Sequence, residues 1–149
     1  MKPLPVGAPL YEYYWLYAAV APTTGEGCWG ELPRLEADCF TVLLHQLSQR
    51  YAASLQIVRL EHAPAHVAQR VQSPDHGILR WWPADSPAWN PVERLWEDLK
   101  ARIDGLDTLV RSSLTALQEH VAGLIRRYTV EAIRSLTGYP YLMEAIAAL

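Results

Sequence analysis

Residues 82–100 have the sequence WPADSPAWNPVERLWEDLK, and the interpretation of the rest of the chain starts from this stretch. Its prolines and serine interrupt the chain after an apolar run, and Asn90 and Pro91 then predict the start of a helix. Asn is a preferred N-cap because its side-chain oxygen accepts a backbone N–H of the first turn, and proline is preorganised for the first helical position. Glu93 is therefore expected in the first turn of this helix, facing the end of the preceding strand.

Two interpretations of Glu93 are open at this point. Asn90 followed three residues later by Glu93 has the spacing of a capping box, in which the carboxylate reaches back to the N-cap N–H and gains from the helix dipole. That role is structural and contributes ~1 kcal/mol. The other interpretation makes Glu93 a metal ligand, and it depends on the wider pattern described below.

The composition is that of one globular domain. Half of the 149 residues are hydrophobic and 19% are charged, and the formal net charge is -3. This balance gives no overall basic footprint, so a nucleic-acid surface has to be local. Cys28 and Cys39 lack the spacing of a metal motif, and no apolar run approaches the ~20 residues that cross a bilayer. We expect a cytoplasmic protein with reduced thiols and no membrane partner.

The hydrophobic pattern alternates between the periods of strands and helices. Strands are predicted at 11–20, 26–32, 54–60 and 78–82. Helices are predicted at 36–51, at 67–71, from Pro91 to Asp104, from Leu106 to Tyr128 and from Val130 to Leu136, with a last apolar stripe at 139–149. This order predicts an α/β fold with a mixed sheet flanked by helices and a helical C-terminal third. Residues 1–149 would form a single domain, comprising an extended arm (1–10), the sheet and its helices (11–89) and the helical part (90–149).

The spacing Pro-x-x-Ser-Pro-x-x-Asn-Pro-x-Glu-x-x-Trp at 83–96 resembles the segment that carries the last acidic residue of DDE transposases, in the bacterial insertion-sequence branch of the mariner superfamily. Residues 17–26, 61–66 and 135–142 look like the second-strand hairpin, the loop after the fourth strand and the C-terminal ending of such proteins. The resemblance implies a ribonuclease H-like catalytic domain that cleaves and joins DNA at transposon ends. It also implies that Glu93 and Glu61 are catalytic and bind Mg²⁺ or Mn²⁺.

The chain departs from the family pattern at two of its three acidic positions. The second ligand of the family is an Asp, usually followed by Asn, whereas this chain has Glu61 and His62. The first ligand lies on a first strand upstream of the hairpin, and Glu12 falls too far into the next strand to replace it. The first strand is therefore expected to be missing. We expect a truncated copy that is inactive alone, or the second half of a split gene whose product is completed by another transposase polypeptide.

A non-enzymatic alternative is also open. The same fold would then bind a full-length transposase and regulate it, with Glu93 serving only as a helix cap. Loss of the first strand would also expose a sheet edge, which predicts a homodimer or poor solubility unless the arm at 1–10 covers that edge.

Two histidines and a set of scattered cations each have a structural interpretation as well as a functional one. The i, i+4 spacing of His62 and His66 is compatible with zinc on a helix, but Pro64 between them favours a turn and ordinary loop histidines. Scattered cations are compatible with phosphate contacts, although solvated helix faces are their usual role. They are Arg80, Lys100, Arg102, Arg126 and Arg127.

Overall fold

The computed structural model describes residues 3–7, 12–61, 71–83, 86–107 and 111–148. Its first sheet is antiparallel, in the order β1-β2-β3, and its second sheet is a parallel pair of β4 and β5. The strands are β1 (Leu4–Gly7), β2 (Tyr13–Ala21), β3 (Glu26–Leu32), β4 (Gln56–Leu60) and β5 (Gly77–Trp81). The helices are α1 (Ala37–Arg50), the 3-10 helix η1 (Pro87–Trp89), α3 (Val92–Asp104), α5 (Leu114–Arg126), α6 (Val130–Thr137) and α7 (Pro140–Ala147). The predicted α/β class and helical C-terminal third are confirmed.

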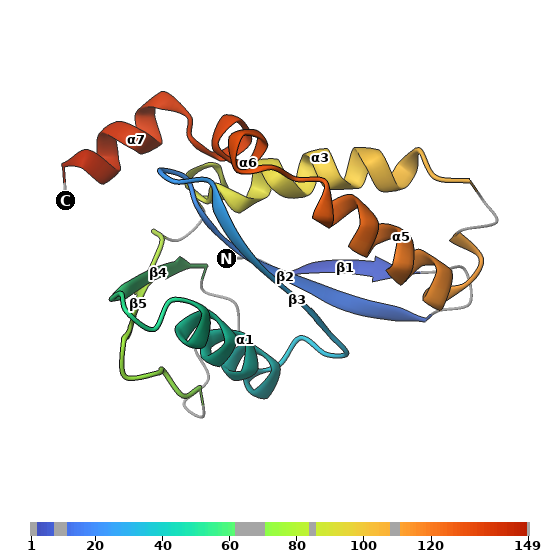
Figure 1. Cartoon of the computed structure of the whole chain (residues 1–149), viewed down its shortest axis with the longest axis horizontal. Coiled ribbons are helices and arrows are strands. Elements are labelled where there is room, and N and C mark those ends of the chain that lie inside the picture. Colours follow the sequence, from blue (N-terminus) through green and yellow to red (C-terminus); the bar gives the residue numbers. More distant parts are fainter. Residues whose placement is uncertain (1–2, 8–11, 62–70, 84–85, 108–110, 149) are drawn as a thin grey trace.

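Strand β2 separates two hydrophobic cores because successive side chains of a strand point to opposite faces. Tyr14, Leu16 and Ala18 face a core shared with α3 and α5. Tyr17, between them in sequence, faces a second core built with α1 and β4. Figure 1 shows this layering, with α1 and the β4–β5 pair on one side of the β2–β3 hairpin and α3, α5 and α6 on the other. Burial on both faces explains why the strand is so rich in aromatic and apolar residues.

The N-terminal arm contains a strand, which the sequence reading described only as extended. β1 pairs antiparallel with the first part of β2, from Leu4 opposite Leu16 to Gly7 opposite Tyr13. Leu4 and Val6 are 6% and 4% exposed, so the arm contributes to the core beside α3. The arm therefore covers the edge of β2 over these four residues.

The predicted long helix from Leu106 to Tyr128 is wrong at its start. The structure begins α5 at Leu114, because Ser113 has an extended backbone (φ -130°, ψ 130°) and its side chain accepts the N–H of Ala116. Serine competes for backbone donors in this way and favours the cap over the helix interior. The short helix predicted at 67–71 lies almost wholly outside the described residues.

The tip of the β2–β3 hairpin packs against α6. Gly25 has a φ of +80°, and a Cβ atom there would lie 2.2 Å from the backbone oxygen of Val130. At the other end of α6, a Cβ on Gly138 would lie 3.2 Å from the oxygen of Pro22. At position 25, only glycine allows both the left-handed backbone of the turn and the close approach to Val130. The hairpin thus fixes α6, which in turn packs beside α3.

Candidate active site

Asn90 connects three parts of the chain at the start of α3. It is 1% exposed, and its Oδ1 atom accepts the N–H of Val92 at 3.3 Å. This bond gives Asn90 a capping contact with the first turn of α3, although the helix begins at Val92, one residue after the predicted Pro91. Its own N–H donates to the carbonyl oxygen of Pro87 at 3.0 Å. The N–H that a capping-box Glu93 would need is therefore already hydrogen-bonded to the backbone, which weakens the purely structural interpretation of Glu93.

The third contact of Asn90 reaches Glu61. Glu61 follows the last residue of β4, and its Oε1 atom accepts a hydrogen bond from Asn90 Nδ2 at 3.3 Å. The backbone N–H of Trp82 also donates to the oxygen of Leu60, so the chain after β5 stays beside the end of β4. Asn90 and Glu61 are 29 residues apart in sequence. The structure thus brings the predicted site residue Glu61 to the residue that starts the helix carrying Glu93.

Glu93 lies in the first turn of α3, as predicted. The residue is half-buried, its Oε1 atom is enclosed by protein, and its N–H donates to the oxygen of Asn90 at 3.1 Å. The buried face of α3 consists of Val92, Leu95, Trp96 and Leu99, none of them more than 3% exposed. Because this face fixes the rotation of the helix, the side chain of Glu93 has a defined direction.

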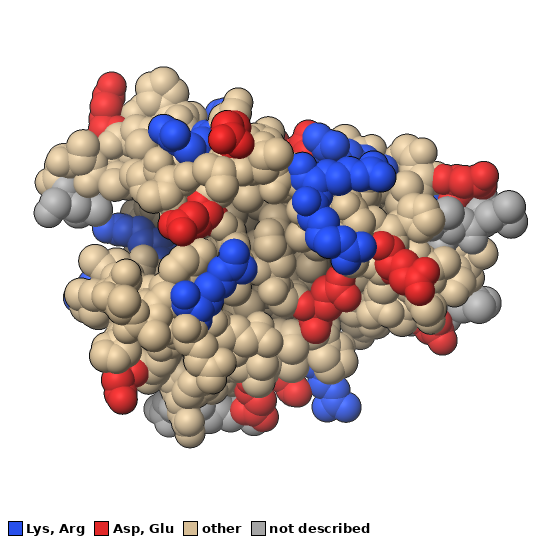
Figure 2. Space-filling view, in the orientation of Figure 1, with Lys and Arg blue, Asp and Glu red and all other residues tan. Residues whose placement is uncertain are grey.

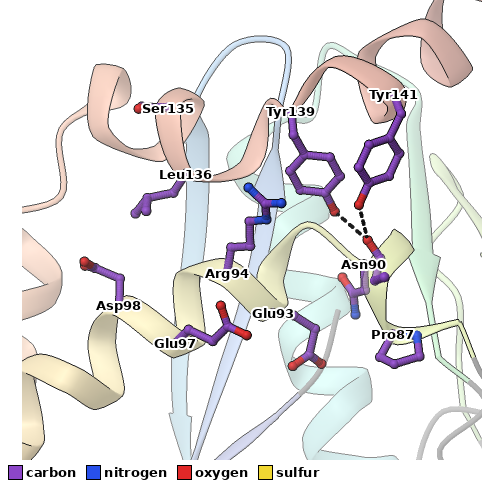
Figure 3. A pocket seen from close by; sticks show the side chains of 11 residues that line it. Pro87, Asn90, Glu93, Arg94, Glu97, Asp98, Ser135, Leu136, Tyr139 and Tyr141 are labelled. Atoms are coloured by element: carbon purple, nitrogen blue, oxygen red, sulfur yellow. Dashed lines mark hydrogen bonds between the residues drawn. The ribbon is translucent and has the colours of Figure 1, made fainter.

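A cavity of about 700 Å³ lies between the start of α3 and helices α6 and α7. Glu93 and Glu97 line one part of it (Figure 3). Tyr139 and Tyr141, which flank Pro140 at the start of α7, line another part, and both hydroxyls donate to the oxygen of Ala88, at 3.0 and 2.8 Å. Burial raises the pKa of Tyr139 to about 12, so this hydroxyl stays protonated and able to donate at neutral pH. The two tyrosines therefore fasten the C-terminal region to the loop before α3.

Sequence reasoning assigned no site role to these tyrosines. The only signal was the Tyr-Pro-Tyr pattern at 139–141, which lies within the family-like ending quoted above. It also assigned no link between Asn90 and Glu61. Pairings between residues so far apart in the chain are not visible in local spacing.

A second cluster further along α3 stabilises the same wall of the cavity. Asp98 Oδ2 accepts hydrogen bonds from Arg102 Nε at 2.7 Å and from the Tyr128 hydroxyl at 2.5 Å. These two bonds, with the Arg102 bond the larger effect, hold the pKa of Asp98 below its usual range. Burial, followed by the bond to Asp98, raises the pKa of Tyr128. Tyr128 also stacks on Trp29 of β3, with ring centroids 5.9 Å apart.

Basic side chains gather locally, although the chain as a whole is acidic. Figure 2 shows Lys and Arg side chains grouped over the region where α3 runs beside α5 and α6. Lys100 and Arg102 of α3 and Arg126 and Arg127 at the end of α5 are all exposed. Arg102 is occupied by Asp98. The exposure of Lys100, Arg126 and Arg127 fits solvated helix faces and phosphate contacts equally.

The described part of the chain contains no cluster of three or more His, Cys, Asp or Glu side chains positioned to hold a metal ion. His62 and His66 lie outside the described residues, so the zinc interpretation of this pair is not tested. Glu61 and Glu93 each contact Asn90, Glu61 by accepting a hydrogen bond from its Nδ2 atom and Glu93 by donating its N–H to the backbone oxygen. Carboxylate oxygens suit Mg²⁺ and Mn²⁺, so the donor type fits these ions, although the number of donors falls short of three.

Among the described helices, none has the length and apolar character needed to cross a membrane.

Comparisons with known proteins found a family model, a relative and a solved structure that are similar to this chain. A family model described as "DDE superfamily endonuclease" matches residues 12–112, which include Glu61, Asn90 and Glu93. An uncharacterized protein of Sinorhizobium fredii, y4pE/y4sA, is 28% identical over 87 residues, which make up 58% of this chain and 64% of that protein. The chain thus matches less than two thirds of that relative. The catalytic core domain of BIV integrase aligns with 91% of this chain and 77% of its own, at 20% identity and a TM-score of 0.49.

Proposed function

The chain belongs to the DDE superfamily of endonucleases, and on that premise we propose that it is a transposase-type catalytic domain of the bacterial insertion-sequence branch of the mariner superfamily. Its substrate would be DNA at transposon ends, and the protein would act in the cytoplasm. Glu93 and Glu61 would be its acidic site residues. The observation that carries the proposal is the hydrogen bond from Asn90 to Glu61, because it joins the end of β4 to the first turn of α3.

Glu61 and Glu93 would hold Mg²⁺ or Mn²⁺ between the end of β4 and the start of α3. When bound, such ions stabilise the attacking and leaving oxygens of an in-line displacement at phosphorus. Asn90 orients Glu61 by donating a hydrogen bond from its Nδ2 atom to the Oε1 atom of the carboxylate. The buried face of α3 orients Glu93. These contacts would limit the directions available to the two carboxylates before a metal ion binds.

We further propose that this chain alone does not cleave DNA at an appreciable rate. None of its residues matches the first acidic ligand of the family, and Glu61 stands where the family has Asp. The extra methylene of Glu moves both carboxylate oxygens, and a displacement of ~1 Å in an active site can cost about a hundredfold in rate. A second transposase polypeptide that supplies the missing carboxylate would restore the site.

Cleavage of the polypeptide by Fe²⁺ tests the metal site without requiring nuclease activity. Fe²⁺ bound in place of Mg²⁺ generates hydroxyl radicals that cut the nearest backbone when ascorbate and peroxide are added. We expect cuts near residue 61 and near residues 90–93, suppressed by excess Mg²⁺ and lost in Glu93→Gln. Glu119→Gln is the matched control, because Glu119 is an exposed carboxylate on α5. Cuts that are absent or unchanged in Glu93→Gln would contradict the proposal and favour a non-enzymatic module.

A plasmid-nicking assay with Mn²⁺ tests the proposed inactivity separately. We expect no nicking above background by the chain alone. Rapid nicking by the unmodified chain that disappears in Glu93→Gln would contradict the inactivity while supporting the site.

A further inference from the structure

Two exposed aromatic rings meet beside the cavity that Glu93 lines. Tyr141 lines this cavity, and Trp89 lies in sequence between two of its lining residues, Ala88 and Asn90. Trp89 of η1 and Tyr141 of α7 are 42% and 43% exposed. Their ring centroids lie 5.8 Å apart with planes at 78°, an edge-to-face contact. Large aromatic side chains are usually more deeply buried than this. The two rings thus present aromatic surface to the solvent next to the candidate active site.

The Tyr141 ring is held in its exposed position by two contacts besides the one with Trp89. The Tyr141 hydroxyl donates to the oxygen of Ala88, the residue directly before Trp89, at 2.8 Å. The Tyr141 ring also contacts the ring of Tyr139, with centroids 4.6 Å apart, and Tyr139 is only 6% exposed. Tyr141 is therefore fastened at its hydroxyl and along its ring. A ligand that stacks on a preorganised surface of this kind loses little affinity to ordering side chains.

The charges around the rings are arranged with one sign on each side of α3. Arg94 is exposed, and its guanidinium carbon lies 4.4 Å from the centroid of the Tyr139 ring. Figure 3 shows Arg94 extending from α3 toward Tyr139, whereas Glu93 and Glu97 leave the helix on its other side. A phosphate is attracted by Arg94 and repelled by the two carboxylates. An anionic strand entering the cavity would therefore follow the aromatic side.

We propose that Trp89 and Tyr141 form a stacking platform for an unpaired base of a DNA strand, with Arg94 contacting a neighbouring phosphate. Proteins that hold single strands combine aromatic faces for the bases with cations along the backbone. The cavity of about 700 Å³ has the size of sites that take small molecules or single nucleotides. The choice of DNA as the ligand rests on the proposed function. The platform would position a nucleotide next to Glu93.

Fluorescence anisotropy with a short labelled single strand, at low salt and in EDTA, tests the platform. We expect Trp89→Ala to weaken binding about tenfold, the effect of losing ~1.4 kcal/mol of stacking. Trp81→Ala is the matched control, because Trp81 is similarly exposed (39%) but lies on β5 and is not part of the Trp89–Tyr141 ring pair. Equal losses in the two variants, or no binding by the unmodified protein, would overturn the proposal. EDTA removes any metal contribution, so failure of the metal site leaves this result unaffected.

Conservative variants separate stacking from a structural role. Trp89→Phe and Tyr141→Phe keep an aromatic face and are expected to keep most of the affinity, whereas Tyr141→Leu should lose it. Arg94→Gln should reduce the slope of log affinity against log salt by about 0.7, the value for one phosphate contact on a single strand. A 2-aminopurine base in the strand should be quenched by the unmodified protein and by Trp81→Ala, but not by Trp89→Ala. If Trp89→Phe loses as much affinity as Trp89→Ala, stacking is not the cause and the proposal is wrong.

Discussion

The two candidate metal ligands stand on supports of different strength. Glu93 is carried by α3, whose inner residue Leu95 is fully buried in the core shared with β2 and α5. Glu61 follows β4, which pairs with β5 in a sheet of two strands within the described part of the chain. One face of β4 is buried through Val58 and Leu60, but Ile57, which precedes Val58 and points to the opposite face, is 63% exposed. Parallel strands are usually covered on both faces. The position of Glu93 is thus set by a core, and that of Glu61 depends more on its hydrogen bond with Asn90.

The largest expected contrast between the two supports is in stability. Leu95→Ala should lower the free energy of unfolding by about 2–5 kcal/mol, because it leaves a cavity in the core under α3. Ile57→Ala should change it by less than about 0.5 kcal/mol, since the side chain is already largely in solvent. Urea denaturation of both variants measures the difference. Similar losses would show that the outer face of β4 is covered in solution.

The support of α3 through α6 and the hairpin tip can be tested at Gly25. Gly25→Ala should destabilise the protein by about 1–3 kcal/mol, because the new Cβ combines a left-handed backbone with a contact 2.2 Å from Val130. Gly105→Ala is the control, because its nearest neighbouring atom would lie 3.6 Å away. Thermal unfolding of the two variants checks this. Equal melting temperatures would mean that the hairpin tip does not hold α6.

Breaking the link between the two supports should have a smaller but localised effect. Asn90→Ala removes the hydrogen bonds to Glu61 and to the N–H of Val92, and should cost about 0.5–2 kcal/mol, the range for losing a helix cap. Amide hydrogen exchange should become faster at the end of β4 as well as in the first turn of α3. Faster exchange confined to α3 would indicate that Glu61 is positioned by other contacts.

The smallest effect concerns the Asp98 cluster and depends on pH. The pKa of Asp98 is lowered in the folded state, so its hydrogen bonds stabilise the protein above the ordinary carboxyl pKa and lose that contribution as acid protonates the group. Tyr128→Phe should therefore cost about 1 kcal/mol near neutral pH, and progressively less below about pH 4. Tyr13→Phe is the control, because Tyr13 is 59% exposed. Thermal melts across this pH range measure the difference, and a pH-independent loss would assign the effect to packing against Trp29.

The sequence predicted those elements whose signals are local. The hairpin partner at 26–32 was placed at its observed residues, and Asn90 with Pro91 identified the start of α3 because capping acts over a few residues. The interruption before α5 was missed because apolar residues keep their helical spacing on both sides of Ser113. Ser113 itself has the extended backbone of an N-cap, so the helix begins only after it. The strand β1 was missed because its pairing with β2 depends on a shared core rather than on its own proline-containing pattern.

The candidate site was only partly predictable for a related reason. Glu93 and Glu61 were identified by family resemblance, and their roles as metal ligands stay a prediction. The bond between Asn90 and Glu61, and the contacts of Tyr139 and Tyr141 with the loop before α3, join residues 29 to 53 positions apart. Such contacts follow from tertiary packing, and no spacing rule for a single element contains them.

Thermal unfolding in increasing Mn²⁺ or Mg²⁺ tests most directly whether Glu61 and Glu93 form one site. An ion that binds only the folded state adds ~2.7 kcal/mol at a hundredfold excess over its dissociation constant. We expect the melting temperature to rise with metal in the unmodified protein and in Glu119→Gln, and the rise to disappear in both Glu61→Gln and Glu93→Gln. No rise up to millimolar metal, or a rise that survives either substitution at the site, would contradict the account and make these carboxylates structural.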